Sequence, residues 1–391
     1  MKIALALSGG GFRATVFHLG VMARLAEGGQ LENVTFLSTV SGGSLCIGMV
    51  HALNGYQWPT SSQFIEKILP ESRRLLTSYD LQRALIFRVL GNFWTLNETR
   101  ADDISALMQK NWGIDVNLRD LPKQPRWMIN ATCYESGKNW RFERFRMGDY
   151  LFGYTYDTAF PLRDAMAASA GFPGGIGPLV VDTSRYSWFK YTEGSEEEAS
   201  REDPEIQVNK KTQAVQPMFS KVHLWDGGVY DNHGLEGLHS FRKGWLENIE
   251  FLIVSDAAGR SKPEKYQWGP KALMRLATGI MMDQIRSLRS RAIVERLTEH
   301  EDKGVFLQTG NTCSYVLKRA NLEEEIPKFS PGCLSEQETT LAAEMPTTIR
   351  KLTSEEFERL FRHGFEVADY TLYAYHAAEF PYLGYGKSLH L

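Results

Sequence analysis

The chain has 391 residues, with 44 Lys and Arg against 47 Asp and Glu, and a formal net charge of −3 at pH 7. Hydrophobic residues make up 43% and charged residues 23%, which is the composition of a folded protein. The balance of charge excludes a broadly basic nucleic-acid binder, and no apolar run reaches the roughly 18 residues of a membrane span.

The first 55 residues predict two consecutive strand–turn–helix units. The apolar run Ile3–Leu7 is typical of a strand buried on both faces of a parallel sheet. Three glycines and a helical pattern follow it, and then Val34–Val40 predicts a strand and Leu45–Leu53 a helix. Such alternation favours an α/β, three-layer fold in which a mostly parallel central sheet is flanked by helices.

The middle of the chain is less regular. Residues 61–120 predict mainly helices, Trp127–Thr132 and Trp140–Phe145 predict strands, and Phe251–Val254 predicts another buried strand. The charge-rich stretch 193–216 predicts a long surface insertion.

The pattern turns helical beyond about residue 261. Ala272–Leu297 is a long amphipathic segment, and Thr353–Glu356 has the spacing of a capping box. We therefore expect an α/β core over residues 1–260 and a helical extension over 261–391 that packs on the core.

The N-terminus and the cysteines indicate the compartment. The N-terminal apolar run ends at Leu7 with no cleavage pattern of a signal peptide. The four cysteines, none of them in a C-x-x-C pair, are too few for a disulfide framework. These features predict a cytoplasmic protein.

A serine lies at the junction between the second strand and its helix, in the sequence Thr39-Val40-Ser41-Gly42-Gly43. A strand–turn–helix with small residues after the serine is typical of a nucleophile elbow, which exposes the serine hydroxyl. The following N–H, that of Gly42, can then face a developing oxyanion. The usual G-x-S-x-G pattern has glycine where this chain has Thr39, and a plain Ser/Gly corner is the alternative.

The glycine run Gly9-Gly10-Gly11 follows the first strand and opens a helix, so its N–H groups can converge on an anion. One interpretation is a phosphate site, as in a nucleotide- or lipid-sensing effector. However, the second strand ends without the carboxylate that a dinucleotide fold needs, and no Lys-Ser or Lys-Thr pair follows the glycines. An oxyanion hole formed by Gly9, Gly10, Gly11 and Gly42 is therefore favoured.

A serine nucleophile needs a base. An apolar strand leads to Asp226-Gly227-Gly228, which places a carboxylate at a tight turn, although Asp-Gly is also a common turn dipeptide. Asp256, after the strand at 251–254, is a competing carboxylate. His233 and His239 follow Asp226 and would complete a Ser-Asp-His triad esterase, so both arrangements remain open.

Together these residues resemble the patatin-like phospholipase family. Four family motifs occur in the family's order within about residues 3–230: Gly9–Arg13 with Ala14 in place of a final glycine, Thr39–Gly43, Ala168–Pro173 and Asp226–Gly228. The resemblance implies a patatin-like fold and a Ser41–Asp226 dyad that hydrolyses fatty-acyl esters of phospholipids, a phospholipase A type of activity. It implies no cofactor and no metal, with Gly43, Gly227 and Gly228 as supporting residues. Arg13 would steady the glycine loop, attract an anionic head group or form a helix-surface ion pair.

The amphipathic segment raises the question of membrane contact. At helical spacing Arg275, Arg286, Arg289 and Arg296 share one face, while Leu273, Ile280, Met281 and Leu288 lie opposite. Peripheral contact of the basic face with anionic lipid is one interpretation, and a solvated basic face above a core-facing apolar face is the other. The expected partner is an acyl-lipid substrate and not a nucleic acid, and no residue identifies an activating ligand or protein.

Overall fold

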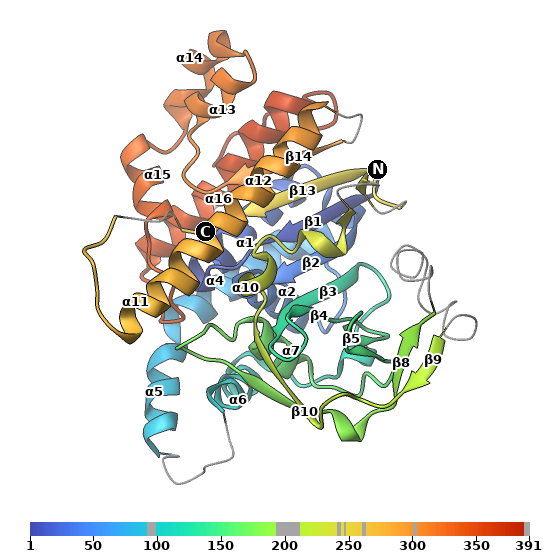
Figure 1. Ribbon diagram of the computed structural model, residues 1–391. Coiled ribbons are helices and arrows are strands. Elements are labelled where there is room, and N and C mark those ends of the chain that lie inside the picture. Colours follow the sequence, from blue (N-terminus) through green and yellow to red (C-terminus); the bar gives the residue numbers. More distant parts are fainter. Residues whose placement is uncertain are drawn as a thin grey trace.

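The computed structural model describes residues 1–91, 99–192, 212–240, 244–245, 248–259, 263–299 and 303–386 (Figure 1). Within them, a mixed twelve-stranded sheet has helices on both faces. Its strand order is β14-β13-β1-β2-β3-β4-β5-β6-β8-β9, and β10 pairs with both β3 and β7 beside this path. Neighbours from β14 to β3 run parallel, and the pairs beyond β3 are antiparallel.

The strands of the parallel part are β1 (Ile3–Leu7), β2 (Val34–Val40), β3 (Arg126–Cys133), β13 (Phe251–Asp256) and β14 (Gly304–Gln308). The antiparallel part contains β4 (Lys138–Phe142), β5 (Met147–Asp149), β6 (Gly153–Thr155), β7 (Leu179–Asp182), β8 (Trp188–Tyr191), β9 (Thr212–Val215) and β10 (Lys221–Asp226). A separate ribbon pairs β11 (His239–Ser240) with β12 (Gly244–Trp245).

Both faces of the parallel part are buried, as the unbroken apolar run of β1 requires. Ile3, Leu5 and Leu7 belong to the larger core cluster, whereas Ala4 and Ala6 belong to the cluster on the opposite face. The larger core is covered by α1 (Gly11–Glu27), α2 (Gly42–Leu53) and α16 (Ser354–His376), and the opposite face by α12 (Met282–Glu299).

The remaining helices surround these layers. They are α3 (Ser61–Gln63), α4 (Leu69–Ser78), α5 (Leu81–Gly91), α6 (Arg100–Trp112), α7 (Leu162–Ser169), α10 (Gly228–Asp231), α11 (Pro270–Met274), α13 (Cys313–Arg319), α14 (Ile326–Phe329) and α15 (Glu336–Ala343). Two π-helical segments, Phe64–Ile68 and Arg275–Met281, continue α3 into α4 and α11 into α12.

The predicted fold class is confirmed, and β1 and β2 have the predicted bounds. The predicted strand Trp140–Phe145 is wrong at its end, because the chain turns after Phe142 with the Glu143 N–H bonded to Arg146 O at 2.9 Å. Of the predicted insertion, residues 193–211 lie outside the described residues. Residues 212–215 form β9 instead of a loop.

The sheet continues past the predicted boundary at residue 260. Gly304–Gln308 lies in the predicted helical extension, yet it forms β14 and pairs in parallel with β13. The rest of the extension packs closely on the core where α16 crosses α1. A Cβ on Gly20 would lie 2.1 Å from Phe361 O, and a Cβ on Gly364 would lie 2.0 Å from Phe17 O. The two helix backbones therefore touch.

The orientation of the amphipathic segment is opposite to the expected one, in which the basic face lies in solvent and the apolar face packs on the core. Arg286 forms ion pairs with Asp256 and Asp283, while Arg289 pairs with Asp231 and Glu236. Asp231 and Asp256 are buried in the core, so Arg286 and Arg289 are drawn inward. Apolar side chains between Leu273 and Leu288 face solvent instead, whereas Ile293 is buried in the core.

Candidate active site

Ser41 occupies a strained turn between β2 and α2. Its φ of 49° and ψ of −114° are an uncommon conformation for a residue with a side chain. The turn needs the two glycines that follow: a Cβ on Gly42 would lie 2.3 Å from Gly11 O, and one on Gly43 would lie 2.4 Å from Leu7 O. This is the strand–turn–helix geometry that the sequence predicts around Ser41.

Asp226 ends β10, which pairs with β3, and β3 in turn pairs with β2, the strand before Ser41. Its carboxyl accepts a 2.7 Å hydrogen bond from the Gly228 N–H. Burial raises the pKa of Asp226 from 3.8 to about 6, although the Gly228 N–H and the Ser41 hydroxyl both lower it. The structure therefore brings the two predicted dyad residues together.

Buried hydroxyls form a chain behind the serine. The Ser41 N–H donates to Ser169 Oγ at 3.0 Å, and Ser169 Oγ lies 2.8 Å from Ser44 Oγ. Ser44 Oγ lies 2.8 Å from Thr39 Oγ1, which accepts a 2.9 Å bond from Trp127 Nε1. Thr39 thus has a role in which a glycine could not replace it. Sequence analysis missed Trp127, because nothing local links it to the elbow.

The motif around Ser169 also supports the aspartate turn. The N–H of Asp226 donates to Gly171 O at 3.0 Å, and the N–H of Gly227 donates to Ser169 O at 3.2 Å. A Cβ on Gly227 would lie 2.5 Å from Asn130 O. The stretch 168–173 therefore holds both halves of the Ser–Asp pair.

The glycine loop lies directly beside the serine, because a Cβ on Gly9 would be 3.0 Å from Ser41 Cβ. The Gly9 N–H donates to Asn232 O at 3.2 Å, which occupies one of the four predicted oxyanion donors. Gly10 and Gly11 have φ values of 143° and 59°. Among the described residues, no backbone acceptor is recorded for the N–H of either Gly10 or Gly11.

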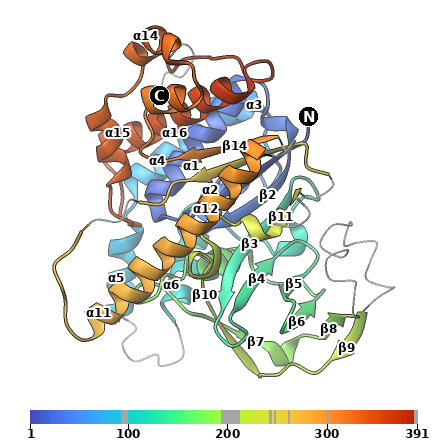
Figure 2. The ribbon, with the colours of Figure 1, turned by 45° about the horizontal axis from the view of Figure 1, so that its top comes forward.

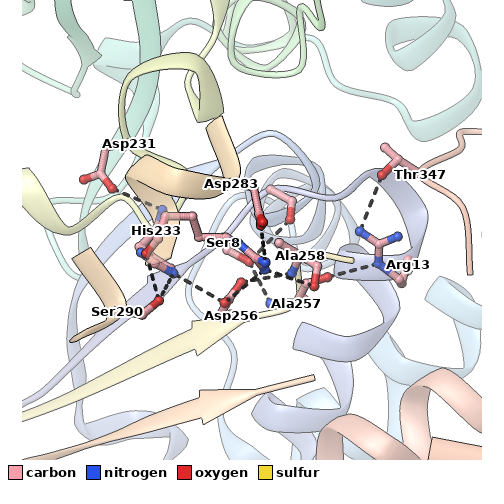
Figure 3. Close-up of polar contacts among 12 residues, drawn as sticks. Ser8, Arg13, Asp231, His233, Asp256, Ala257, Ala258, Asp283, Ser290 and Thr347 are labelled. Atoms are coloured by element: carbon pink, nitrogen blue, oxygen red, sulfur yellow. Dashed lines mark hydrogen bonds and ion pairs between the residues drawn. The ribbon is translucent and has the colours of Figure 1, made fainter. Parts of the chain in front are cut away.

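Arg13 is buried and connects the glycine loop to two distant segments (Figure 3). Its Nε donates to Ala257 O at 3.1 Å, and its terminal nitrogens donate to Met345 O and, at 3.4 Å, to Thr347 Oγ1. Burial lowers its pKa to about 10. Of the three roles that the sequence left open for Arg13, these contacts match the steadying of the loop and not a helix-surface ion pair.

A cavity of about 1030 Å³ opens above Ser41 and Asp226. The glycine loop forms part of its wall, and the segment Ala343–Ile349 forms another part. Apolar side chains from α5 and from the loop after α7 line it further: Leu85, Ile86, Phe172 and Ile176. The volume is at the upper end of what ligand pockets usually have.

The competing acid and bases lie in other environments. His233 is buried, with its Nε2 3.4 Å from Asp256 Oδ2 and 3.4 Å from Ser290 Oγ (Figure 3). Burial raises the pKa of Asp256, but His233 and Arg286 outweigh this and lower it to about 2. His239 packs edge-on against Trp245, with ring centroids 4.8 Å apart. Neither histidine is among the described residues that line the cavity.

The described residues contain neither a metal site nor a helix that could cross a membrane. No group of three or more His, Cys, Asp or Glu side chains is arranged to hold a metal ion. None of the described helices combines the length and the apolar character that crossing a bilayer requires.

One known structure supports this fold, and two others are more distantly similar. Human GIVD cytosolic phospholipase A2 superposes with a TM-score of 0.53 at 13% identity, covering 97% of this chain and 62% of that one. The same human protein in complex with methyl gamma-linolenyl fluorophosphonate and terbium chloride gives 0.49 at 13% identity, with 97% and 59% covered. VipD from Legionella pneumophila gives 0.37 at 12% identity, with 95% and 66% covered. This chain therefore spans less than two thirds of the length of the human protein.

The match to a sequence family is more specific than the similarity to known structures. No curated protein matches the chain at a significant level. A family model described as patatin-like phospholipase matches residues 5–239, which is more than half of the chain. That range contains Ser41, Asp226, the glycine loop and the stretch around Ser169. The protein belongs to the patatin-like phospholipase family.

Proposed function

We propose that this protein is a serine hydrolase of lipid acyl esters, in which Ser41 is the nucleophile and Asp226 its base. The observation that carries the proposal is that Ser41, at a strained elbow, and the buried Asp226 carboxyl line the same large cavity beside the glycine loop. A strained nucleophile beside a base in a cleft is the arrangement that acyl transfer requires.

In the first half-reaction, Asp226 takes the hydroxyl proton as Ser41 Oγ attacks the ester carbonyl carbon. The carbonyl oxygen becomes an oxyanion, which the N–H groups of Gly10, Gly11 and Gly42 stabilise. Collapse of this intermediate breaks the ester bond, and the leaving alcohol takes its proton from Asp226. Water then attacks the acyl-enzyme with the same base and releases the fatty acid. The Gly9 N–H takes no part, since Asn232 O occupies it.

The base is suited to this task at neutral pH. A carboxylate with a pKa of about 6 accepts a proton more readily than an ordinary aspartate, and it is still ionised at pH 7. The pairing of His233 with Asp256 supports the dyad over a Ser-Asp-His triad. The closeness of the glycine loop to Ser41 supports an oxyanion hole over a phosphate site.

The proposed substrate is a phospholipid cleaved at a fatty-acyl ester, and the proposed setting is the cytoplasm with peripheral membrane contact. The family description and the human cytosolic phospholipase A2 fold support the substrate class. Apolar cavity walls from α5 and from the loop after α7 support an acyl chain as the bound group.

The test is covalent labelling with a fluorophosphonate together with phospholipid hydrolysis. Ser41→Ala is expected to abolish both, and Asp226→Asn to reduce both by several orders of magnitude. Ser62→Ala, at an exposed serine, is the matched control and is expected to leave both unchanged. His233→Gln distinguishes the triad, since a dyad retains activity per folded molecule in this variant. Full hydrolysis by Ser41→Ala would refute the proposal.

A further inference from the structure

The segment from α11 to the middle of α12 turns several apolar side chains to solvent. Leu273 is 69% exposed and Met281 61%, although both are on an ordered helix. We call these side chains the apolar stripe, which consists of Leu273, Leu276, Ile280, Met281, Ile285 and Leu288. A contiguous exposed apolar surface of this kind usually marks an interaction site.

Ion pairs with buried carboxylates of the core hold the helix in this orientation. Arg286 pairs with Asp256 at 3.4 Å and Arg289 with Asp231 at 3.5 Å. Because these arginines are engaged on the inner side, the stripe is presented outward. The exposure is therefore built into the packing of the segment.

The loop before α11 adds a second kind of chemistry. Trp268 and Tyr266 are 81% and 74% exposed, and their rings pack edge-to-face with centroids 4.9 Å apart. Exposed Lys265 and Lys271 lie on either side of them in the sequence. Trp and Tyr favour the polar–apolar boundary of a bilayer, and lysines favour anionic head groups.

The segment that carries the stripe also forms part of the wall of the proposed active site. Arg275, Gly279 and Met282, from the same segment, line the cavity above Ser41. Across the cavity, α5 contributes Ile86 to the lining, and Ile86 and Phe87 are 51% and 71% exposed. Figures 1 and 2 both show α11 and α5 side by side, at the same end of the molecule. Exposed apolar side chains thus occur on two of the elements that form the cavity wall.

We propose that the apolar stripe, with Trp268, Tyr266 and the exposed side chains of α5, is a docking surface for a lipid bilayer containing anionic lipid. This inference rests on the proposed lipid substrate and names the surface that brings the cavity to it. Docking would bring the elements that form the cavity wall to the lipid surface that holds the substrate. The contact is apolar with flanking lysines, in contrast to the basic-face contact that the sequence suggests.

The experiment measures vesicle binding without turnover. The Ser41→Ala protein is sedimented with vesicles of phosphatidylcholine alone, or of phosphatidylcholine mixed with phosphatidylglycerol. Leu273→Gln with Ile280→Gln in this background is expected to weaken partitioning about tenfold, since each exposed apolar side chain loses its burial in lipid. Lys265→Gln with Lys271→Gln is expected to weaken only the binding that depends on phosphatidylglycerol. Leu341→Gln, at a 47% exposed leucine on α15, is the matched control.

A second readout locates the contact. Brominated lipid is expected to quench a fluorescence component that Trp268→Phe removes. Unchanged partitioning of the Leu273/Ile280 variant would overturn the inference, as would a dimer that these two substitutions dissociate. Vesicle binding without hydrolysis by the parent enzyme would refute the proposed function and leave the docking surface standing. Hydrolysis of a soluble ester without vesicle binding would refute the docking surface and leave the proposed function standing.

Discussion

Thr348 O accepts a 2.8 Å hydrogen bond from the N–H of Phe12, so a segment of the C-terminal part holds the glycine loop in place. The same segment receives the Arg13 guanidinium at Met345 O and Thr347 Oγ1. Residues 345–348 lie outside the matched family range of 5–239. The geometry of the proposed oxyanion hole therefore depends on chain that the family motifs do not include.

Arg13→Met should reduce kcat for a soluble ester far more than it raises KM. The substitution leaves Ala257 O and Met345 O without their donor, which frees the glycine loop to move away from the developing oxyanion. We expect a stability loss of about 1–3 kcal/mol. Arg74→Met, which removes an exposed pair with Glu71, should cost at most about 1 kcal/mol and leave kcat unchanged. A kcat of Arg13→Met equal to that of Arg74→Met would contradict this role.

The raised pKa of Asp226 predicts the pH dependence of activity. Asp226 accepts a proton only when it is ionised, so kcat/KM should fall as the pH drops below about 6. Initial rates on a soluble ester across this range measure the effect and avoid changes in lipid packing. An inflection near the ordinary aspartate value of 3.8 would contradict Asp226 as the base.

The same pKa predicts that Asp226 destabilises the fold at neutral pH. Because its native pKa lies above the unfolded value, the native state binds the proton more tightly. The resulting stability is fully present below 3.8 and is lost as pH rises through about 6. A shift of about two pKa units corresponds to about 3 kcal/mol. In urea unfolding, Asp226→Asn should gain stability over wild type at neutral pH, and the gain should shrink toward about pH 4.

The sequence is informative where the chemistry is local. Ser41 with its two glycines, and Asp226 with Gly227, lie in short segments whose residue types require a tight turn, and the structure forms those turns. Apolar runs likewise identify β1 and β2, because a strand buried on both faces needs an unbroken run.

The missed features depend on contacts between distant residues. Gly304–Gln308 lies in a region for which the sequence predicts helices. It forms a strand because it pairs with the edge of β13. Arg286 and Arg289 of α12 face inward because Asp256 and Asp231, which come from other elements, lie beneath them. Helical periodicity identifies two faces of this helix, but it does not indicate which face meets the core.

Asp256→Ala should loosen α12. In the native state, Asp256 pairs with Arg286 of that helix and with His233. Removing the carboxylate leaves the Arg286 guanidinium without its buried partner. The loss of one partner of a buried ion pair typically lowers the free energy of unfolding by about 3–5 kcal/mol. Hydrogen exchange in Met282–Glu299 should accelerate, while exchange in α16, which packs on the opposite face, should change only through global stability. Equal acceleration of exchange in both helices would show that the Asp256–Arg286 pair does not stabilise α12 locally.

Gly42→Ala should disable the site through geometry alone. An alanine Cβ would lie 2.3 Å from Gly11 O and 2.9 Å from the Ala14 Cβ, so the elbow and the glycine loop must move apart. Since both supply proposed oxyanion donors, we expect kcat to fall by about 10²-fold or more, at a stability cost of about 1–3 kcal/mol. Gly332→Ala is the control, because its Cβ would meet nothing within 4 Å. Activity of Gly42→Ala close to that of Gly332→Ala would mean that the oxyanion is held elsewhere.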